Sequence, residues 1–345
     1  MTEQAHIPPA SRRKVGFFIG FILFLILALS GGWYWASTKL DESVTNFTTQ
    51  LQRDGKVLEC TNQDVRGYPF RLGLHCDKLA FADPVGGITI SGNALRSAAQ
   101  LYRPGHMIAE IDSPYDVSAP GLVPLTLDWS NLKSSANVGT DGFQRISIVA
   151  DQLKISANDF GDRDLLGSLE QLQLHARPVP ETARANLDLA ISGEKWVVDD
   201  NGANLIEPVS FNLQVKLKDG LRIIESGNDL LTFIKNEGGE GELTDLTLST
   251  QSGGRIAATG PLSIDNQGLV SGELVLEFDD PQKLVTYAQS IFPPLADSLS
   301  QSVQYLEAFA QNTDGGIKVR DLKISIRQGK IFLGFFEIGE VPRLF

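Results

Sequence analysis

The residues that could carry out chemistry are few and scattered. The chain has four histidines, at positions 6, 75, 106 and 175, and they lie far apart in the sequence. The spacings that mark a phosphate-binding loop, a dinucleotide fingerprint, a serine-hydrolase elbow or an H-E-x-x-H metal site are absent. His106 lies beside Pro104-Gly105, where a solvated turn residue is the ordinary interpretation. We therefore predict no catalytic residues and no enzyme.

Pairs of acidic residues close in sequence are the remaining chemical candidates. Such pairs could cleave a glycosidic bond if their oxygens converge at the right separation, or they could ligate calcium. They are Asp112 with Asp116, Asp199 with Asp200, and Asp279 with Asp280. The alternating Asp/Asn pattern of a calcium loop is missing, and capping of turns explains most of these side chains. We expect no metal and no cofactor, and a hydrolase of envelope polymers is the least favoured function.

Cys60 and Cys76 are the two cysteines of the chain. In an exported domain the default is a disulfide between them, and the alternative is two unpaired buried thiols. Without a histidine cluster nearby, two cysteines make a poor zinc site. The disulfide is the expectation because the elements before it direct this part of the chain across a membrane.

The segment Val15–Ala36 is free of charge and long enough to cross a bilayer as a helix. Arg12, Arg13 and Lys14 precede it and favour the cytoplasmic side for residues 1–14. Aromatic residues close it at the other end, namely Trp33, Tyr34 and Trp35. We predict a single-pass inner-membrane protein with the bulk of its chain in the periplasm. A cleaved signal ending near Ala28-Leu29-Ser30 is the alternative.

The net charge of −12 restricts the partners. The first 36 residues carry a basic excess, so the acidic excess lies in the exported part. An acidic body repels phosphate backbones, and nucleic-acid binding is therefore disfavoured. About 300 residues after the anchor are enough for one large domain or two small ones.

The remaining elements follow from hydrophobic periodicity. Residues 37–55 have helical spacing and predict a connector, whereas 56–345 alternate in the manner of strands. Lys56–Cys60 and Arg71–Cys76 are expected to form a hairpin stapled by the disulfide.

Val209–Leu217 predicts a strand and Phe160–Gly167 a loop. Asp229–Asn236 has helical spacing, and the glycine-rich run at 238–241 ends it. Residues 281–312 predict a helical pair broken at Pro293-Pro294. The apolar stretch Ile331–Phe336 is expected to be buried in the core, and the alternative is that one of its faces meets lipid or another apolar surface. The fold class is mainly β, an antiparallel groove or sandwich.

The turn Gly67–Arg71 is the most specific local feature. Its residues Tyr68, Pro69, Phe70 and Arg71 could face a partner. Alternatively, the two aromatic rings pack into the end of the sheet while the proline fixes the turn, which is the interpretation we favour.

With its Cys60…Gly67-Tyr68-Pro69-Phe70-Arg71…Cys76 pattern, the chain resembles an uncharacterised proteobacterial family of membrane-anchored envelope proteins. Further stretches carry the same resemblance, at 100–106, 259–265, 267–272, 328–334 and 341–344. An anchor followed by many strands is also similar, in architecture, to AsmA-type envelope proteins. That likeness implies an open, lipid-lined β-groove and transfers no catalytic residue.

Together these patterns predict a binding or scaffolding protein of the cell envelope. The expected ligand is a lipid or another apolar molecule held in a sheet-lined groove. The alternative is a structural organiser that binds an envelope protein partner at the inner membrane without a ligand.

Overall fold

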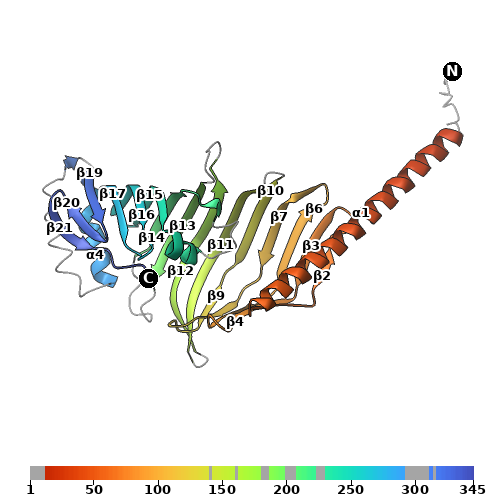
Figure 1. Cartoon of the computed structure of the whole chain (residues 1–345), viewed down its shortest axis with the longest axis horizontal. Helices are drawn as coiled ribbons and strands as arrows, with labels where there is room; N and C mark the ends of the chain where they lie inside the picture. The colour runs from red at the N-terminus through yellow and green to blue at the C-terminus, as the bar shows by residue number, and fades with distance from the viewer. Residues whose placement is uncertain are drawn as a thin grey trace, which may run out of the picture.

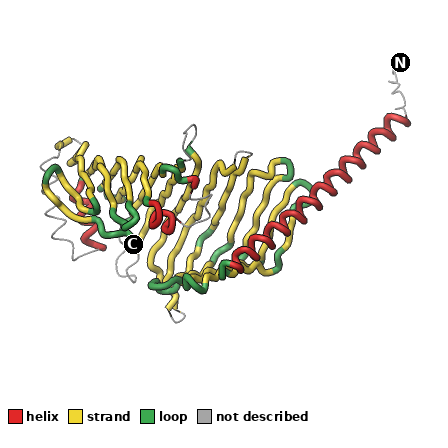
Figure 2. Tube along the Cα trace, in the orientation of Figure 1, coloured by secondary structure: helices red, strands yellow, loops and turns green. Residues whose placement is uncertain are grey.

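The computed structural model describes residues 12–139, 142–159, 162–179, 186–198, 207–222, 230–291, 311–313 and 316–345. Within them a single long helix precedes one antiparallel sheet of 21 strands. Figure 1 shows the sheet as one long curved layer, with the helix leaving one end and strands β19 to β21 at the other. The same division of the chain into helix and strand is coloured in Figure 2.

Helix α1 spans Arg12–Arg53, 42 residues, so its axis is about 63 Å long. The predicted anchor and the predicted connector therefore form one continuous helix. By length and composition, residues Lys14–Arg53 are apolar enough to cross a membrane. The helix ends at Arg53, and Gly55 follows it with a positive φ of 75°, which suits a left-handed residue after a helix. The helix contacts strands β1, β2 and β3.

The strands divide into an early group and a late group. The early strands are β1 Val57–Thr61, β2 Asp64–Arg66, β3 Arg71–Cys76, β4 Lys78–Asp83, β5 Ile88–Gly92, β6 Leu95–Gln100, β7 Arg103–Ile111, β8 Tyr115–Ser118, β9 Leu125–Asp128 and β10 Asn131–Gly139. The late strands are β11 Gly142–Asp159, β12 Asp162–Pro178, β13 Leu187–Val198, β14 Val209–Leu217, β15 Gly239–Thr250, β16 Arg255–Ile264, β17 Val270–Asp279, β18 Gln311–Thr313, β19 Gly316–Arg327, β20 Lys330–Leu333 and β21 Phe336–Glu340.

The early strands form two limbs that meet at β11. The first limb is β2, β3, β6, β7 and β10, each bonded to the next, and β10 pairs with Arg145–Asp151 of β11. The second limb is β1, β4, β5, β8 and β9, and β9 pairs with Lys154–Ala157 of the same strand. The late strands then continue from β11 through β17 and β19 to β21.

A line of chain bends separates the limbs. The chain passes from a strand of one limb to a strand of the other at Asp77, at Asn93-Ala94, at Asp112–Pro114 and at Trp129-Ser130. Along β11 and β13 the same line continues at Gln152 and Lys195, which have positive φ angles. We call this line the bend. A sheet folded in this way is neither a flat layer nor a sandwich of two separate sheets.

Polar side chains satisfy the backbone along the bend. The Asn93 amide donates to the Ser113 carbonyl over 2.8 Å, and the Ser113 hydroxyl donates to the Trp129 carbonyl over 2.9 Å. The Trp129 indole in turn donates to the Ile111 carbonyl over 2.8 Å, and its ring stacks on Tyr115 with 5.6 Å between centroids. These groups replace the ladder hydrogen bonds that the bend interrupts.

Two short helices accompany the late strands. Helix α3 spans Leu230–Glu237, close to the 229–236 helical spacing visible in the sequence, and α4 spans Pro281–Ile291. The first part of the predicted helical pair is thus confirmed. Its second part, 292–310, lies outside the described residues, and Gln311 with Asn312 belongs to strand β18 instead.

Two details differ from the sequence expectation. Strand β1 pairs with β4, so it forms no hairpin with β3. The apolar stretch at 331–336 is split between β20 and β21, and Phe335 and Phe336 are 99% and 78% exposed, so their expected burial is wrong. Gly334, at a positive φ of 61°, makes the turn that places both rings outside.

Candidate functional site

The inner face

One face of the sheet is apolar across nearly its whole width. Antiparallel pairing puts partnered residues on the same face, and residues two apart follow them. One such row runs across the first limb and the late strands without a charge. It consists of Leu74, Ser97, Ala109, Ser134, Ile148, Leu174, Ile191, Leu213, Leu246, Ala258, Leu276 and Leu322.

The rows on either side have the same character. The row nearest the bend consists of Cys76, Leu95, Ile111, Leu132, Ala150, Leu172, Gly193, Phe211, Leu248, Ile256 and Phe278. The row farther from the bend includes Leu72, Ala99, Met107, Ala136, Ile146, Ala176, Leu189, Val215 and Leu243. We call this surface the inner face.

The second limb has an apolar face of its own. Its rows are Cys60, Leu79, Gly92, Tyr115, Leu127 and Ile155, then Leu58, Phe81, Ile90, Val117, Leu125 and Ala157. The Cys60–Cys76 disulfide joins this face to the inner face of the first limb, with 5.2 Å between the Cα atoms. The two apolar faces therefore face each other across the inside of the bend.

The predicted disulfide is confirmed, but its role differs from the expectation. It connects the two limbs rather than the two strands of one hairpin. Cys76 is only 2% exposed, because it lies at the corner where the limbs meet. The bond therefore restrains the angle between the limbs.

The inner face is not covered as a protein core is. Ile148, Leu174, Ile191 and Leu213 are all half-buried, and Ile146 is 37% exposed. The chain exposes 22585 Å², whereas a compact protein of 37.6 kDa exposes about 14,000 Å². Helix α1 and the open faces of the sheet both contribute to the excess.

The far end of the inner face has a cover. Phe278, Val319 and Leu322 form a buried cluster, and Leu284 of α4 packs against it. Val285 of the same helix is also buried. Helix α4 thus covers the inner face over β16, β17 and β19, and among the described residues this is the place where the sheet has a packed core.

From β2 to β15 the inner face crosses nine strand-to-strand steps of about 4.8 Å, so it extends roughly 43 Å along the curve of the sheet. Such a surface can bury acyl chains, each methylene contributing about 0.8 kcal/mol when it leaves water. In the three rows named above it carries no charged side chain, and its polar groups are the hydroxyls of Ser97 and Ser134.

The outer face and its pockets

The opposite face is polar and carries ion pairs between strands. Lys133 pairs with Glu110 at 3.9 Å, Lys216 with Glu242 at 3.8 Å, and Arg96 with Asp112. All these side chains are largely exposed, so each pair contributes little to stability. These charged side chains favour contact of this face with water rather than its burial.

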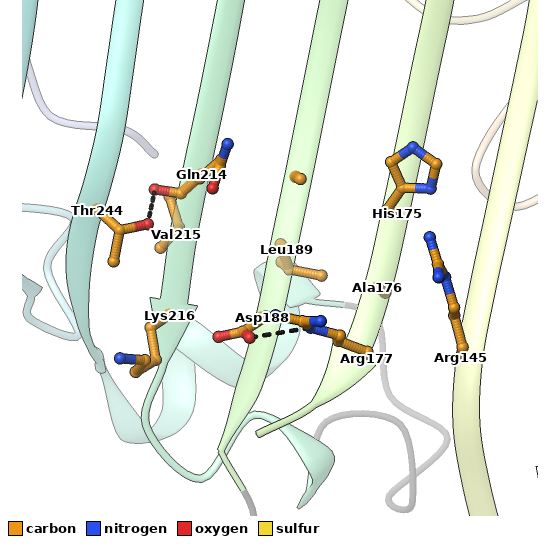
Figure 3. A pocket seen from close by; sticks show the side chains of 11 residues that line it. Arg145, His175, Ala176, Arg177, Asp188, Leu189, Gln214, Val215, Lys216 and Thr244 are labelled. Atoms are coloured by element: carbon orange, nitrogen blue, oxygen red, sulfur yellow. Dashed lines mark hydrogen bonds and ion pairs between the residues drawn. The ribbon is translucent and has the colours of Figure 1, made fainter. Parts of the chain in front are cut away.

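A pocket of about 410 Å³ lies on this outer face, over β11 to β15 (Figure 3). Arg177 donates to Asp188 over 3.2 Å, and Lys216 and Arg145 flank that pair. His175 contacts the Ser147 hydroxyl at 2.9 Å through Nδ1 and the Gln173 side-chain oxygen at 3.1 Å through Nε2. Burial lowers the pKa of His175, and the charge of Arg145 lowers it further.

This pocket contains no catalytic arrangement. Its one carboxylate, Asp188, is already paired with Arg177, and the ring nitrogens of His175 already have partners. A second pocket of about 650 Å³ lies over β15 to β19 on the same face. It contains two carboxylates and two cations, namely Glu242, Glu273, Lys323 and Arg327, so it has no net charge.

Where the other predicted residues lie

The other histidines and the predicted carboxylate pairs do not come together in one site among the described residues. His75 lies on β3, and His106 on β7 contacts the Asn137 side-chain oxygen at 2.5 Å. Asp116 accepts from the Thr126 hydroxyl over 2.7 Å. Within the described part of the chain, no three His, Cys, Asp or Glu side chains gather as metal ligands. Asp199 and Asp200 lie outside the described residues.

Asp279 and Asp280 have structural partners. Asp280 pairs with Lys283 at 2.8 Å and accepts from the Ile317 amide at 3.1 Å. Asp279 pairs with Arg320. Burial raises the pKa of Asp279, but the hydrogen bond and charge of Arg320 outweigh burial, so its pKa lies below the usual range.

The turn at Gly67–Arg71 packs against helix α1. Tyr68 and Phe70 are 57% and 56% exposed, so the expectation that both rings enter the end of the sheet is wrong. The Tyr68 ring meets Trp33 edge-on with 5.5 Å between centroids, and the Trp33 indole donates to the Arg71 carbonyl over 2.7 Å. The Tyr68–Pro69 peptide bond is cis.

Of the residues predicted to flank the anchor, Trp33 is half-buried against this turn and Trp35 is 67% exposed. Arg12 and Arg13 begin helix α1, followed by Lys14, which is exposed.

The bend is the feature that sequence reasoning missed. A signal for it was present, since polar residues or proline interrupt the apolar alternation at Asp77, Asn93, Pro114 and Ser130. Such interruptions indicate strand ends, which they are, but their alignment into one line depends on the register.

Relation to known proteins

The fold and the inner face define a class: a β-sheet protein, bent along its length, with an apolar inside and an N-terminal apolar helix. The family model described as "Uncharacterized protein conserved in bacteria (DUF2125)" matches residues 33–342. The chain belongs to that family. No curated protein and no solved structure matches the chain.

Proposed function

We propose that this protein binds an apolar ligand, the acyl chains of a lipid, on the inner face of its bent sheet, while α1 anchors it in the inner membrane with the sheet in the periplasm. The observation that carries the proposal is the uncharged inner face, on which Ile146, Ile148, Leu174, Ile191 and Leu213 stay partly exposed. Exposed apolar surfaces of this size are rare in soluble monomers and mark binding sites.

Three further observations support it. The apolar faces of the two limbs face each other, which suits a ligand that is apolar along its length. The outer face is polar, so the sheet does not need burial on both sides. The disulfide agrees with an oxidising compartment beyond the anchor.

A matched pair of variants tests the proposal. Ile191 lies on the inner face, and its neighbour Ser192 lies on the outer face, paired with Gln173 and Asn212. Cells expressing the full chain are given a fatty acid that carries a photoactivatable diazirine, and lipid adducts on the purified protein are counted by mass spectrometry.

Wild type and Ser192→Asp are expected to carry adducts on inner-face peptides. Ile191→Asp is expected to lose most of them, because a carboxylate on that face repels an acyl chain. Circular dichroism checks that both variants are folded. Equal labelling of inner and outer faces, or none, would contradict the proposal and favour a scaffolding role.

A further inference from the structure

The hairpin turn between β2 and β3 is fixed to the apolar part of α1. Two hydrogen bonds hold it there. The Tyr68 hydroxyl lies 2.8 Å from the Ser30 hydroxyl, and the Trp33 indole donates to the Arg71 carbonyl. The turn therefore sits at the level of helix residues 30 to 33, which belong to the uncharged segment Val15–Ala36.

The rise of the helix sets the depth of this level. Trp33 lies eighteen residues after Val15, or about 27 Å along the axis, close to the far boundary of a hydrocarbon core about 30 Å thick. Arg53, at the other end of α1, lies about 30 Å beyond Trp33. The turn is thus at the interface, and the start of strand β1 is well outside it.

The side chains at this level suit a headgroup layer. Phe70 is 56% exposed, and Tyr102 in the next turn, between β6 and β7, is 75% exposed. The two turns are adjacent, since the Leu101 amide donates to the Phe70 carbonyl over 2.9 Å. Arg71 and Arg103 are both exposed beside these rings. A tyrosine, whose ring has a polar end, favours the membrane interface together with cations, and the apolar ring of Phe70 beside it can enter the lipid.

We propose that the turns Gly67–Arg71 and Leu101–Arg103 enter the headgroup layer of the bilayer that α1 crosses and hold this end of the sheet against it. The inference rests on the proposed function only in placing α1 in the membrane. Leu72, an inner-face residue, directly follows Arg71. The inner face therefore begins at the leaflet, where acyl chains can reach it without crossing water.

Depth measurements on the full chain test this docking. The native cysteines are bonded to each other, so one introduced cysteine is the sole thiol available for a nitroxide label. The label is placed by Phe70→Cys or by Tyr102→Cys. The control is Val85→Cys, since Val85 is 92% exposed in the turn between β4 and β5, near the end of α1 that lies far from Trp33. The protein is held in nanodiscs of phosphatidylethanolamine and phosphatidylglycerol.

The measured quantity is the collision rate of each label with oxygen, which concentrates in lipid, divided by its collision rate with a water-soluble nickel chelate. This collision ratio is expected to be several-fold higher at 70 and 102 than at 85. All three side chains are exposed, so the substitutions leave the packing intact. The same collision ratio at all three positions would overturn the docking. So would protection of 70 and 102 from both reagents, which would point to a protein partner. Lipid adducts at Ile191 are measured separately, so failure of the docking and failure of ligand binding are distinguishable.

Discussion

Removal of the disulfide is the perturbation whose size follows most directly from the structure. Cys60 and Cys76 are separated by 16 residues in sequence, and the chain-entropy relation for a loop of this length gives about 3 kcal/mol. The double variant Cys60→Ala/Cys76→Ala keeps the corner apolar while it frees the two limbs. For a body of this size, that loss corresponds to a fall in Tm of about 5 °C.

The assay is thermal unfolding of the full chain in nanodiscs, followed by circular dichroism of the sheet. Reduction of the wild-type protein is the internal control, because it should reproduce the loss seen in the double variant and leave that variant unchanged. A change in Tm below about 1 °C would mean that the limbs hold their angle without the bond, and the reasoning would be refuted.

Other perturbations test other parts of the structure. Val319→Ala should lower the free energy of unfolding by about 2 kcal/mol, because Val319 is fully buried under α4. The control Val85→Ala, at an exposed turn, should change it by less than about 0.5 kcal/mol. Thermal unfolding compares the two variants. Tyr68→Phe should weaken the contact between the turn and α1 by about 1 kcal/mol, because the hydrogen bond to Ser30 is lost. The hydrogen-exchange rate of residues 67–71 should then rise, and an unchanged rate would contradict that contact. Hydrogen bonds from Asn131 and then Gln171 hold the pKa of Asp151 below its usual value. The contribution of Asp151 to stability is therefore present above about pH 4 and is lost as the pH falls through the folded pKa. Asp151→Asn should reduce the fall of Tm at acid pH, and an unchanged fall would argue against this role for Asp151.

Local pattern predicted the elements well where each residue's environment follows from its neighbours. The uncharged segment gave helix α1, and the alternation at Val209–Leu217 matches β14. The break at Gly238 ends α3, and the helical spacing after Pro281 matches α4. In all four cases a period of two or of 3.6, bounded by glycine, proline or charge, was sufficient.

What failed depends on contacts between distant segments. The segment Phe160–Gly167 reads as a loop because it is polar and rich in glycine, yet β12 begins at Asp162, since pairing with β11 stabilises the extended backbone. The partner of β1 is β4 rather than β3, because the chain crosses the bend at Asp77 before it returns. The ring contact between Tyr68 and Trp33 joins residues 35 positions apart, and local hydrophobic periodicity cannot predict such a contact.

The central claim is that the inner face holds a lipid, and a photocrosslinker built into the protein tests it most directly. Benzoylphenylalanine is placed at Ile191 on the inner face, or at its outer-face neighbour Ala190, and the full chain is irradiated in living cells. We predict that the protein with the crosslinker at 191 gains the mass of a lipid and that the protein with the crosslinker at 190 does not. An adduct at neither position, equal lipid adducts at both, or a protein adduct at 191 would contradict the account.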